Sequence, residues 1–533
     1  MTYRNLISPT SSSTAAFPPH DAALSNGTAP TSNPASHSPP PLKKVLTKGS
    51  GINRHLQHME YAVRGELVLR AEELAKKLKL AQQPAAALPF DHVTYCNIGN
   101  PQSVGQPPIT FVRQALAAAV CPSLIGAGPP EQSASKGMFP PDVEERVKQV
   151  LEASHGVGAY SDSRGLEVVR ARVADAIRER DGGIACDPEH VFLTNGASDA
   201  VKTMLGLIVR GTGDGVMIPI PQYPLYSASM TSMRGVQVGY YLDEDKGWSL
   251  SMAELQERLE EARGQGVDVR AIVIINPGNP TGQVLTRQNM EGVIRFCERE
   301  GLVILADEVY QQNVYVTDKP FISFKKVVTE MHSKVELASF HSVSKGVMGE
   351  CGLRGGYMEV VNMHQDVIEL IYKVLSVSLC SNVIGQLAVD LMMTPPKPGE
   401  PSYELYNAEV TAIFESLRRK ALALSEGLNS FEGVSCNPSE GAMYLFPRIT
   451  IPEAAKVAAS ERGMASPDVL YCVELLEQTG ICVVPGSGFG QKEGTYHFRT
   501  TFLPPEDQIS DVIEKMRTFH SNFMKKYSAN SQS

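Results

Sequence analysis

Short apolar runs alternate with amphipathic stretches between about residue 110 and residue 390. The apolar runs are rich in Val, Ile and Leu, as in strands that are buried on both faces. The stretches between them have the spacing of surface helices. This order predicts a largely parallel sheet with helices on both sides, an α/β fold. The five runs cover residues 191–193, 215–218, 271–275, 302–306 and 337–340.

The pattern changes on either side of this region. Residues 58–82 have helical apolar spacing among charged residues, which predicts an amphipathic helix. Residues after the proline-rich stretch at 395–398 indicate helices with a few strands, a smaller α+β unit. We therefore predict a large domain over 110–395 and a small domain built from 46–109 and 396–533.

Residues 1–45 are rich in Ser, Thr, Pro and Ala, and they cannot bury enough apolar surface to order themselves. We predict a disordered leader. It is Ser-rich and acid-poor like a mitochondrial transit peptide, but Arg4 is its only basic residue before Lys43. The sequence therefore favours a cytoplasmic location, with a mitochondrial one as the alternative.

Composition argues against several classes of protein. The 533 residues carry a net charge of −9, whereas a nucleic-acid binder usually has a basic balance. The sequence contains no run of 18 apolar residues, so no membrane span is predicted. The nine cysteines are scattered without metal-binding spacing and indicate reduced thiols, so no metal site is expected.

Polar clusters follow several of the predicted strands, at the edge where parallel sheets bind ligands. Lys345 lies behind Ser342 and Ser344 in a glycine-rich turn, a setting suited to Schiff-base chemistry. The hydroxyls of these two serines and Arg354, further along the same loop, offer donors to a phosphate. A lysine in such a position can also be an ordinary surface residue.

Two further side chains suit a cationic cofactor ring and an acidic substrate. Asp307 directly follows an apolar run, so it should face a cation or a donor, and a protonated pyridine nitrogen would serve. A helix cap or a metal ligand is the alternative for Asp307. Arg499, among apolar and small residues, should pair with a carboxylate, either of a ligand or of a structural salt bridge.

The other clusters are less specific. Residues 194–199 open a helix and expose N–H groups to an anion, or simply cap that helix. Tyr223, in a proline-rich loop, suits stacking on a planar ring or packing in the core. Asn279 lies in a turn of two prolines, two asparagines and two glycines, from which its side-chain donor could reach a phenolic oxygen.

Four of these segments together resemble the fold-type I pyridoxal phosphate aminotransferases: 276–282, 307–310, 342–345 and 498–502, in that order and spacing. The resemblance runs from about residue 97 to 503. Segments 61–66, 97–102, 221–226 and 348–359 are similar to the alanine aminotransferases of that family. The resemblance implies a large pyridoxal phosphate-binding domain with a mostly parallel sheet, and a smaller α+β domain.

The resemblance also implies roles for single residues. Lys345 would form the aldimine with pyridoxal 5′-phosphate, and Asp307 would pair with the pyridine nitrogen. The other cofactor-binding residues would be Asn279 and Tyr310 at the ring oxygen, Tyr223 on the ring face, and Ala197, Ser198, Ser342 and Arg354 at the phosphate. Arg499 would bind the substrate carboxylate with help from Asn279 and the Gly99 backbone.

Tyr160 resembles the tyrosine that one protomer of a homodimer lends to its partner's phosphate site. Arg354 stands nine residues after Lys345, where many relatives have eight, and this longer loop is typical of alanine aminotransferases.

The implied reaction is a ping-pong transamination of L-alanine and 2-oxoglutarate. Glutamate–glyoxylate aminotransferase, a lyase of the same fold and a non-catalytic cofactor-binding regulator are the alternatives. No second carboxylate clamp for glutamate is evident in the sequence.

Overall fold

The computed structural model describes residues 52–57, 59–61, 65–80, 88–127 and 137–529. The predicted leader, residues 1–45, lies outside these ranges. The predicted boundary between leader and small domain lies outside them too.

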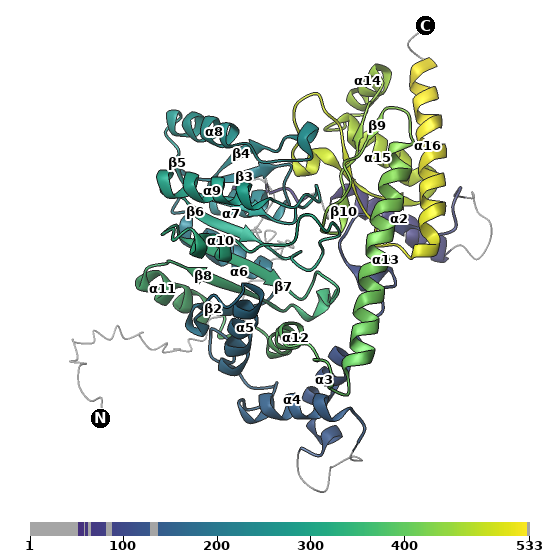
Figure 1. Ribbon diagram of the computed structural model, residues 1–533. Helices are drawn as coiled ribbons and strands as arrows, with labels where there is room; N and C mark the ends of the chain where they lie inside the picture. The colour runs from purple at the N-terminus through teal and green to yellow at the C-terminus, as the bar shows by residue number, and fades with distance from the viewer. Residues whose placement is uncertain (1–51, 58, 62–64, 81–87, 128–136, 530–533) are drawn as a thin grey trace, which may run out of the picture. The chain divides into compact units, whose positions relative to one another are not determined.

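A seven-stranded sheet with the order β2-β8-β7-β6-β5-β3-β4 forms the centre of the fold (Figure 1). All neighbours run parallel except β8, which is antiparallel to both β2 and β7. The strands are β2 (Val191–Thr194), β3 (Asp214–Ile220), β4 (Val236–Tyr241), β5 (Asp268–Ile275), β6 (Val303–Asp307), β7 (Leu337–Ser342) and β8 (Gly356–Val361). Each of the five predicted runs overlaps one of these strands, and only Leu302 at the start of one run lies outside, which confirms the mostly parallel α/β prediction.

Helices cover both faces of this sheet, because its strands carry apolar side chains on both sides. One face packs against α8 (Met252–Gly264), α9 (Arg287–Glu300) and α10 (Phe324–Glu330). The other packs against α6 (Ala197–Ile208), α7 (Leu225–Met233) and α11 (Gln365–Ser376). Helices α5 (Glu167–Arg180) and α12 (Val383–Met393) pack on each other, and α3 (Thr110–Val120) packs on α4 (Pro141–Glu152).

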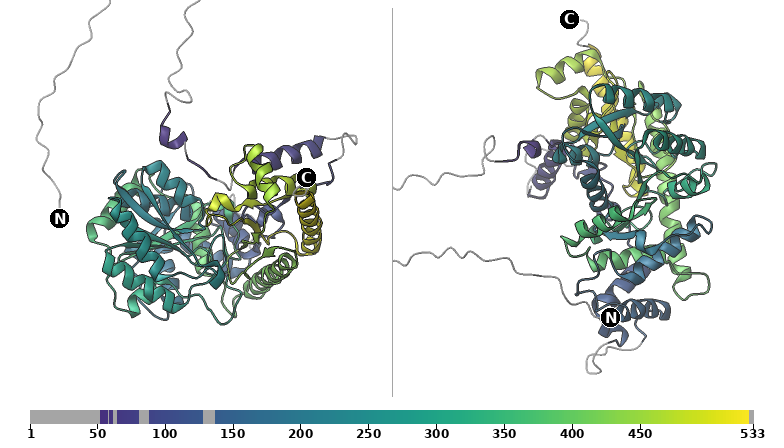
Figure 2. Two further views of the ribbon diagram at one scale, coloured as in Figure 1. Left: turned by 90° about the horizontal axis from the view of Figure 1, so that it is seen from above. Right: turned by 90° about the vertical axis from the view of Figure 1, so that its left-hand side faces the viewer.

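Short strands and long helices form a second region, seen from three sides in Figures 1 and 2. Its helices are α2 (Glu66–Leu80), α13 (Tyr403–Asn429), α14 (Glu453–Glu461), α15 (Pro467–Thr479) and α16 (Ile509–Ala529), and a single turn, α1 (Arg54–Gln57), precedes them. The strands pair as β1 (Thr94–Tyr95) with β12 (Ile481–Cys482), β9 (Val434–Ser435) with β11 (Arg448–Ile449), and β14 (Phe498–Thr501) with β10 (Tyr444–Leu445) and β13 (Val484–Pro485). The β1–β12 pair joins the two segments assigned to the small domain, but the boundaries after 109 and 395 stay predictions.

The predicted helix over 58–82 is shorter in the structure. Helix α2 begins at Glu66, and Met59 and Tyr61 lie outside it. Met59 is 43% exposed, so this part of the apolar spacing does not mark a buried helix face. Tyr61 instead reaches a pocket described below.

The described residues contain neither a membrane-spanning helix nor a cluster of metal-binding side chains. None of their helices is both long and apolar enough to cross a membrane. Nor do three or more of their His, Cys, Asp or Glu side chains gather where they could hold a metal ion.

Candidate active site

A cavity of about 470 Å³ lies at the carboxyl ends of the parallel strands. It gathers residues from the turn after β5, from β6 and β7, from the start of α6, and from β10 and β14 of the second region. Every predicted site residue except Tyr160 lines it: Gly99, Ala197, Ser198, Tyr223, Asn279, Asp307, Tyr310, Ser342, Lys345, Arg354 and Arg499.

Lys345 follows β7 and points its amine into this cavity. Its Nζ donates a 2.8 Å hydrogen bond to the carbonyl oxygen of Gly99. A side chain at position 99 would not fit, because its Cβ would stand 2.9 Å from Lys345 Nζ and still closer to Tyr444 Oη. Gly99 therefore allows the backbone to approach the amine closely.

Asp307 ends β6 and is buried. Its Oδ2 accepts a 2.8 Å hydrogen bond from Tyr226 Oη, whereas its Oδ1 has no partner in the described chain. Burial raises the pKa of Asp307 to about 6, although the Tyr226 hydroxyl, the nearby Val309 amide and the charge of Lys345 oppose that rise. A buried carboxylate with a free oxygen is costly, so this site suits a ligand that brings a donor or a positive charge.

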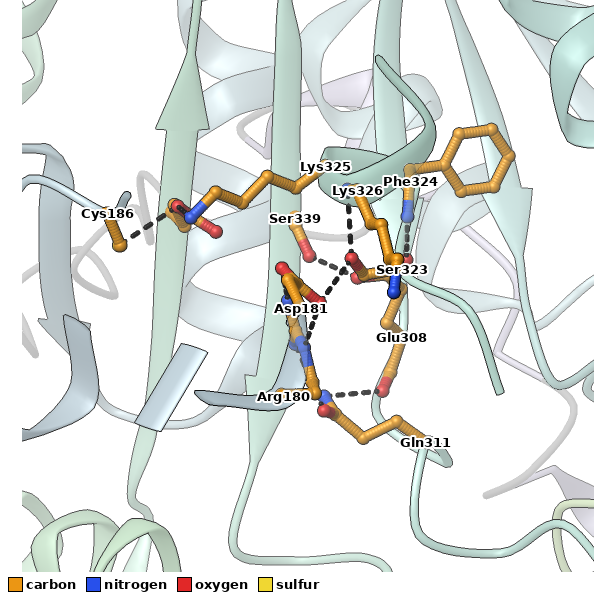
Figure 3. Close-up of polar contacts among 11 residues, drawn as sticks. Arg180, Asp181, Cys186, Glu308, Gln311, Ser323, Phe324, Lys325, Lys326 and Ser339 are labelled. Atoms are coloured by element: carbon orange, nitrogen blue, oxygen red, sulfur yellow. Dashed lines mark hydrogen bonds and ion pairs between the residues drawn. The ribbon is translucent and has the colours of Figure 1, made fainter. Parts of the chain in front are cut away.

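A buried polar network holds the chain next to Asp307 (Figure 3). The Glu308 carboxylate accepts a hydrogen bond from the Phe324 amide at 2.8 Å and another from Ser339 Oγ. Burial raises the pKa of Glu308 to about 7, and the nearby Arg180 guanidinium opposes that rise. These contacts to α10 and β7 fix the end of β6 and thereby the position of Asp307.

Arg499, on β14, is 1% exposed. Its guanidinium donates to Asn279 Oδ1 at 3.1 Å and to the carbonyl of Asn97. It lies between the rings of Tyr444 and Phe489, 4.2 and 4.6 Å from their centroids. No carboxylate in the described chain forms an ion pair with Arg499, so a structural salt bridge does not account for it.

The N-terminus of α6 and the Arg354 loop form an anion-binding corner. Gly196 precedes the helix with φ 83° and provides no side-chain cap, which leaves the first N–H groups, at Ala197 and Ser198, open to an anion. Arg354 Nη2 donates to Asn195 O at 2.9 Å and to Ser198 Oγ at 3.3 Å. A Cβ on Gly196 would stand 2.7 Å from that guanidinium.

The two serines before Lys345 both line the cavity, but their hydroxyls differ in hydrogen bonding. Ser342 lines the cavity, but its hydroxyl donates to Gly355 O at 3.0 Å, so it would have to turn to bind a phosphate. Ser344, whose hydroxyl the sequence also offers to a phosphate, has a buried hydroxyl without a partner among the described residues and also lines the cavity.

Two tyrosines were missed. Tyr226 bonds to Asp307, and its position three residues after Tyr223 at the start of α7 was an available signal. Tyr444 lines the cavity from a two-residue strand for which the sequence pattern gave no signal. Tyr160 lies apart from the cavity and is 76% exposed.

A larger cavity, about 620 Å³, lies between the segment after β4 and residues 491–497. Carboxylates dominate its charged lining, and none of the predicted site residues borders it. We therefore treat the 470 Å³ cavity as the candidate active site.

Comparison with known proteins agrees with this geometry. The family model for aminotransferases of class I and II matches residues 125–516. The chain belongs to this family. Pyridoxal phosphate is the cofactor of these aminotransferases.

Three individual matches place the chain more closely. A probable mitochondrial alanine aminotransferase of Dictyostelium discoideum is 51% identical over 91% of this chain and 90% of its own length. Glutamate–glyoxylate aminotransferase 1 of Arabidopsis thaliana is 49% identical over 90% of this chain and 97% of its own. The solved alanine aminotransferase of Pyrococcus furiosus has a TM-score of 0.69 at 22% identity, covering 88% of this chain and 100% of its own, and thus shares the fold.

The residues of the cavity fit this cofactor. The free Asp307 Oδ1 suits the ring nitrogen, and the uncapped α6 N-terminus with Arg354 suits the phosphate. Lys345 offers the amine and Tyr223 an aromatic face at the cavity wall.

Proposed function

We propose that the chain transfers the amino group of L-alanine to 2-oxoglutarate, which yields pyruvate and L-glutamate. The observation that carries this proposal is the 51% identity, over 91% of the chain, to a relative named as a probable alanine aminotransferase. The cavity supports it, because a lysine, a buried carboxylate with a free oxygen and an arginine without an ionic partner face one space.

In the proposed mechanism Arg499 binds the α-carboxylate of the substrate in a forked pair. Asn279 orients Arg499 through the 3.1 Å bond to its guanidinium, and Asp307 keeps the cofactor ring nitrogen protonated. With the cofactor bound, Asn279, through its amide nitrogen, and Tyr310 would donate to the ring oxygen, and the Tyr310 hydroxyl would then turn away from Tyr444 Oη, to which it donates in this structure. Ala197, Ser198, Ser342 and Arg354 hold the phosphate.

Pyridoxal phosphate supplies a carbonyl carbon that takes up the amino group, and a ring that accepts the electron pair left when the α proton leaves. Lys345 Nζ takes that proton as general base. It then gives the proton to the cofactor carbon that has taken up the amino group. The Gly99 carbonyl holds the amine in place for both steps. The two substrates bind one after the other at the same arginine, as a ping-pong reaction requires.

A second candidate is glutamate–glyoxylate transamination, which the 49% identity to a relative of that name favours. Both reactions use the same residues and differ in the substrate side chain. Among the residues described, the cavity lining offers no cation besides Lys345, Arg354 and Arg499.

Half-reactions followed by absorbance distinguish these candidates. L-alanine, L-glutamate and glycine are added one at a time to the cofactor-loaded protein, with Lys345→Ala as control. We expect alanine and glutamate to convert the bound cofactor, and the variant to turn over neither. Conversion by glycine and glutamate but not by alanine would replace our proposal with the second candidate.

We also propose a homodimer in which Tyr160 reaches the phosphate site of the partner. Tyr160 is 76% exposed, and the segment that follows α11 carries exposed apolar residues, Val377 at 85% and Leu379 at 50%. Ser163 Oγ donates to Leu379 O at 2.6 Å and ties the two segments together. An apolar surface of this kind is typical of an interface.

Hybrid dimers test this sharing. Mixing Lys345→Ala with Tyr160→Ala chains, each inactive or weak by itself, should restore activity, because one site per hybrid then has both residues. If the mixture is only as active as the two variants added together, Tyr160 is not shared between protomers in this way.

We also propose that the protein is located in mitochondria. The relative named as mitochondrial favours the mitochondrial alternative over the cytoplasmic prediction. A fluorescent fusion of the full chain should enter mitochondria and a fusion that starts at residue 46 should not. If the full-length fusion stays in the cytoplasm, the original prediction stands.

A further inference from the structure

Tyr444 lies at the centre of the candidate site. It belongs to β10, which pairs with the strand that carries Arg499, and it is 2% exposed. Its ring lies under the Arg499 guanidinium, and its hydroxyl accepts a 2.9 Å hydrogen bond from Tyr310 Oη. It therefore touches two residues to which the proposed function gives a task.

Its hydroxyl oxygen also lies near the Lys345 amine, without a hydrogen bond between them in this structure. Both Tyr444 Oη and Lys345 Nζ crowd the point where a Cβ of Gly99 would stand, so the two atoms are near neighbours. The Gly99 carbonyl accepts one proton of the amine at 2.8 Å. A tyrosine oxygen that accepts one bond from Tyr310 still has a lone pair for a second donor.

We infer that Tyr444 is a positioning residue, whose hydroxyl and the Gly99 carbonyl together hold the protonated amine of Lys345. An ammonium has three donors, and two fixed acceptors orient it far better than one. The inference rests on the proposed role of Lys345 as the base. It assigns the Tyr444 ring a separate task, which is to support Arg499.

The charges around Tyr444 agree with this arrangement. Burial raises its pKa, but the charges of Lys345 and Arg499 and the hydrogen bond from Tyr310 outweigh burial, so the pKa lies below the ordinary tyrosine value. The other titratable groups that face Tyr444 or its partner Tyr310 are Cys351, Tyr223 and Asp307.

The variant Tyr444→Phe removes the hydroxyl and keeps the ring. We expect kcat for L-alanine to fall about tenfold or more, as for loss of one hydrogen bond to a charged group, with KM changed less than about twofold. The kinetic isotope effect with α-deuterated alanine should rise, because proton transfer then limits the rate. A tyrosine hydroxyl that is only structural would not produce this combination.

A second readout needs neither cofactor nor turnover. In the cofactor-free protein, an amine-reactive reagent labels the uncharged form of Lys345, and mass spectrometry of its peptide gives the rate. Loss of an acceptor for the ammonium should speed labelling about three- to tenfold in Tyr444→Phe. Tyr240→Phe is the matched control, since this buried hydroxyl bonds only to Val273 O at 2.8 Å, outside the cavity.

The outcomes separate the two ideas. Unchanged labelling together with an unchanged isotope effect overturns the role of Tyr444, even if kcat falls. If the wild type fails to use alanine, the proposed substrate fails, and the labelling comparison still decides whether Tyr444 holds the amine.

Discussion

Arg499→Lys tests the proposed carboxylate anchor most directly. The substitution keeps a positive charge but removes the planar fork that can bind a carboxylate through two parallel N–H groups. In the structure this fork is held by Asn279 Oδ1, the Asn97 carbonyl and the rings of Tyr444 and Phe489. A lysine would reach the same space with one flexible ammonium and would lose the stacking on both rings.

The expected magnitude follows from these contacts. One charge-assisted hydrogen bond contributes roughly 1.5–3 kcal/mol, and 1.4 kcal/mol is a factor of ten. We therefore expect kcat/KM for L-alanine to fall by about one to two powers of ten. The same change should weaken discrimination between L-alanine and L-alaninamide, because the amide lacks the carboxylate that Arg499 would bind.

The assay is an initial-rate series in each substrate with saturating cofactor, accompanied by thermal unfolding. Arg448→Lys is the control, since Arg448 lies on β11 outside the candidate site, 3.8 Å from Glu244. It should change kcat/KM less than about twofold. The reasoning is refuted if folded Arg499→Lys keeps kcat/KM within about threefold of wild type.

Two further variants test the buried charges. Because burial raises the pKa of folded Asp307 from 3.8 to about 6, the native state binds more protons than the unfolded state between these values, and Asp307 lowers stability as pH rises through that window. The free energy of unfolding of cofactor-free Asp307→Asn, measured in urea, should therefore rise relative to that of wild type by roughly 1–3 kcal/mol as the pH goes from 4.5 to 7.5. The same difference between variant and wild type at both pH values would contradict the raised pKa of Asp307. Lys325→Met should cost roughly 3–5 kcal/mol, because Lys325 and Glu359 pair at 2.8 Å with both side chains 3% exposed and the lone carboxylate stays buried. Adding Glu359→Gln should recover most of that loss, and no recovery would contradict the explanation.

The sequence predicted best those features that depend on local pattern. Buried parallel strands are short, continuous apolar runs, so β5 and β6 and the polar residues at their ends, Asn279 and Asp307, could be placed together. Strand β8 was missed because Gly356 and the buried Glu359 interrupt its apolar run, and apolar periodicity would not in any case give its antiparallel direction. The edge strand β4, with half-exposed residues, carries a weaker signal and was missed too.

The remaining parts of the site depend on long-range packing. Tyr444 enters the site from a strand of two residues. Its proposed positioning role depends on Arg499, Lys345 and Tyr310, which only the fold brings near it. The free Oδ1 of Asp307 and the redirected Ser342 hydroxyl are likewise properties of packing. Helix α2 was predicted too long because apolar spacing before Glu66 reflects exposed residues and a pocket contact.

The pairing of β1 with β12 has a consequence for how the protein is made. On the ribosome, Thr94 emerges early but must wait for Ile481, and Lys345 is translated long before Arg499. The central sheet can form during synthesis, while the strands that complete the site arrive only with the last part of the chain. A nascent chain that stalls before Ile481 would expose an unpaired strand and an open apolar pocket, the features that chaperones bind and that promote aggregation.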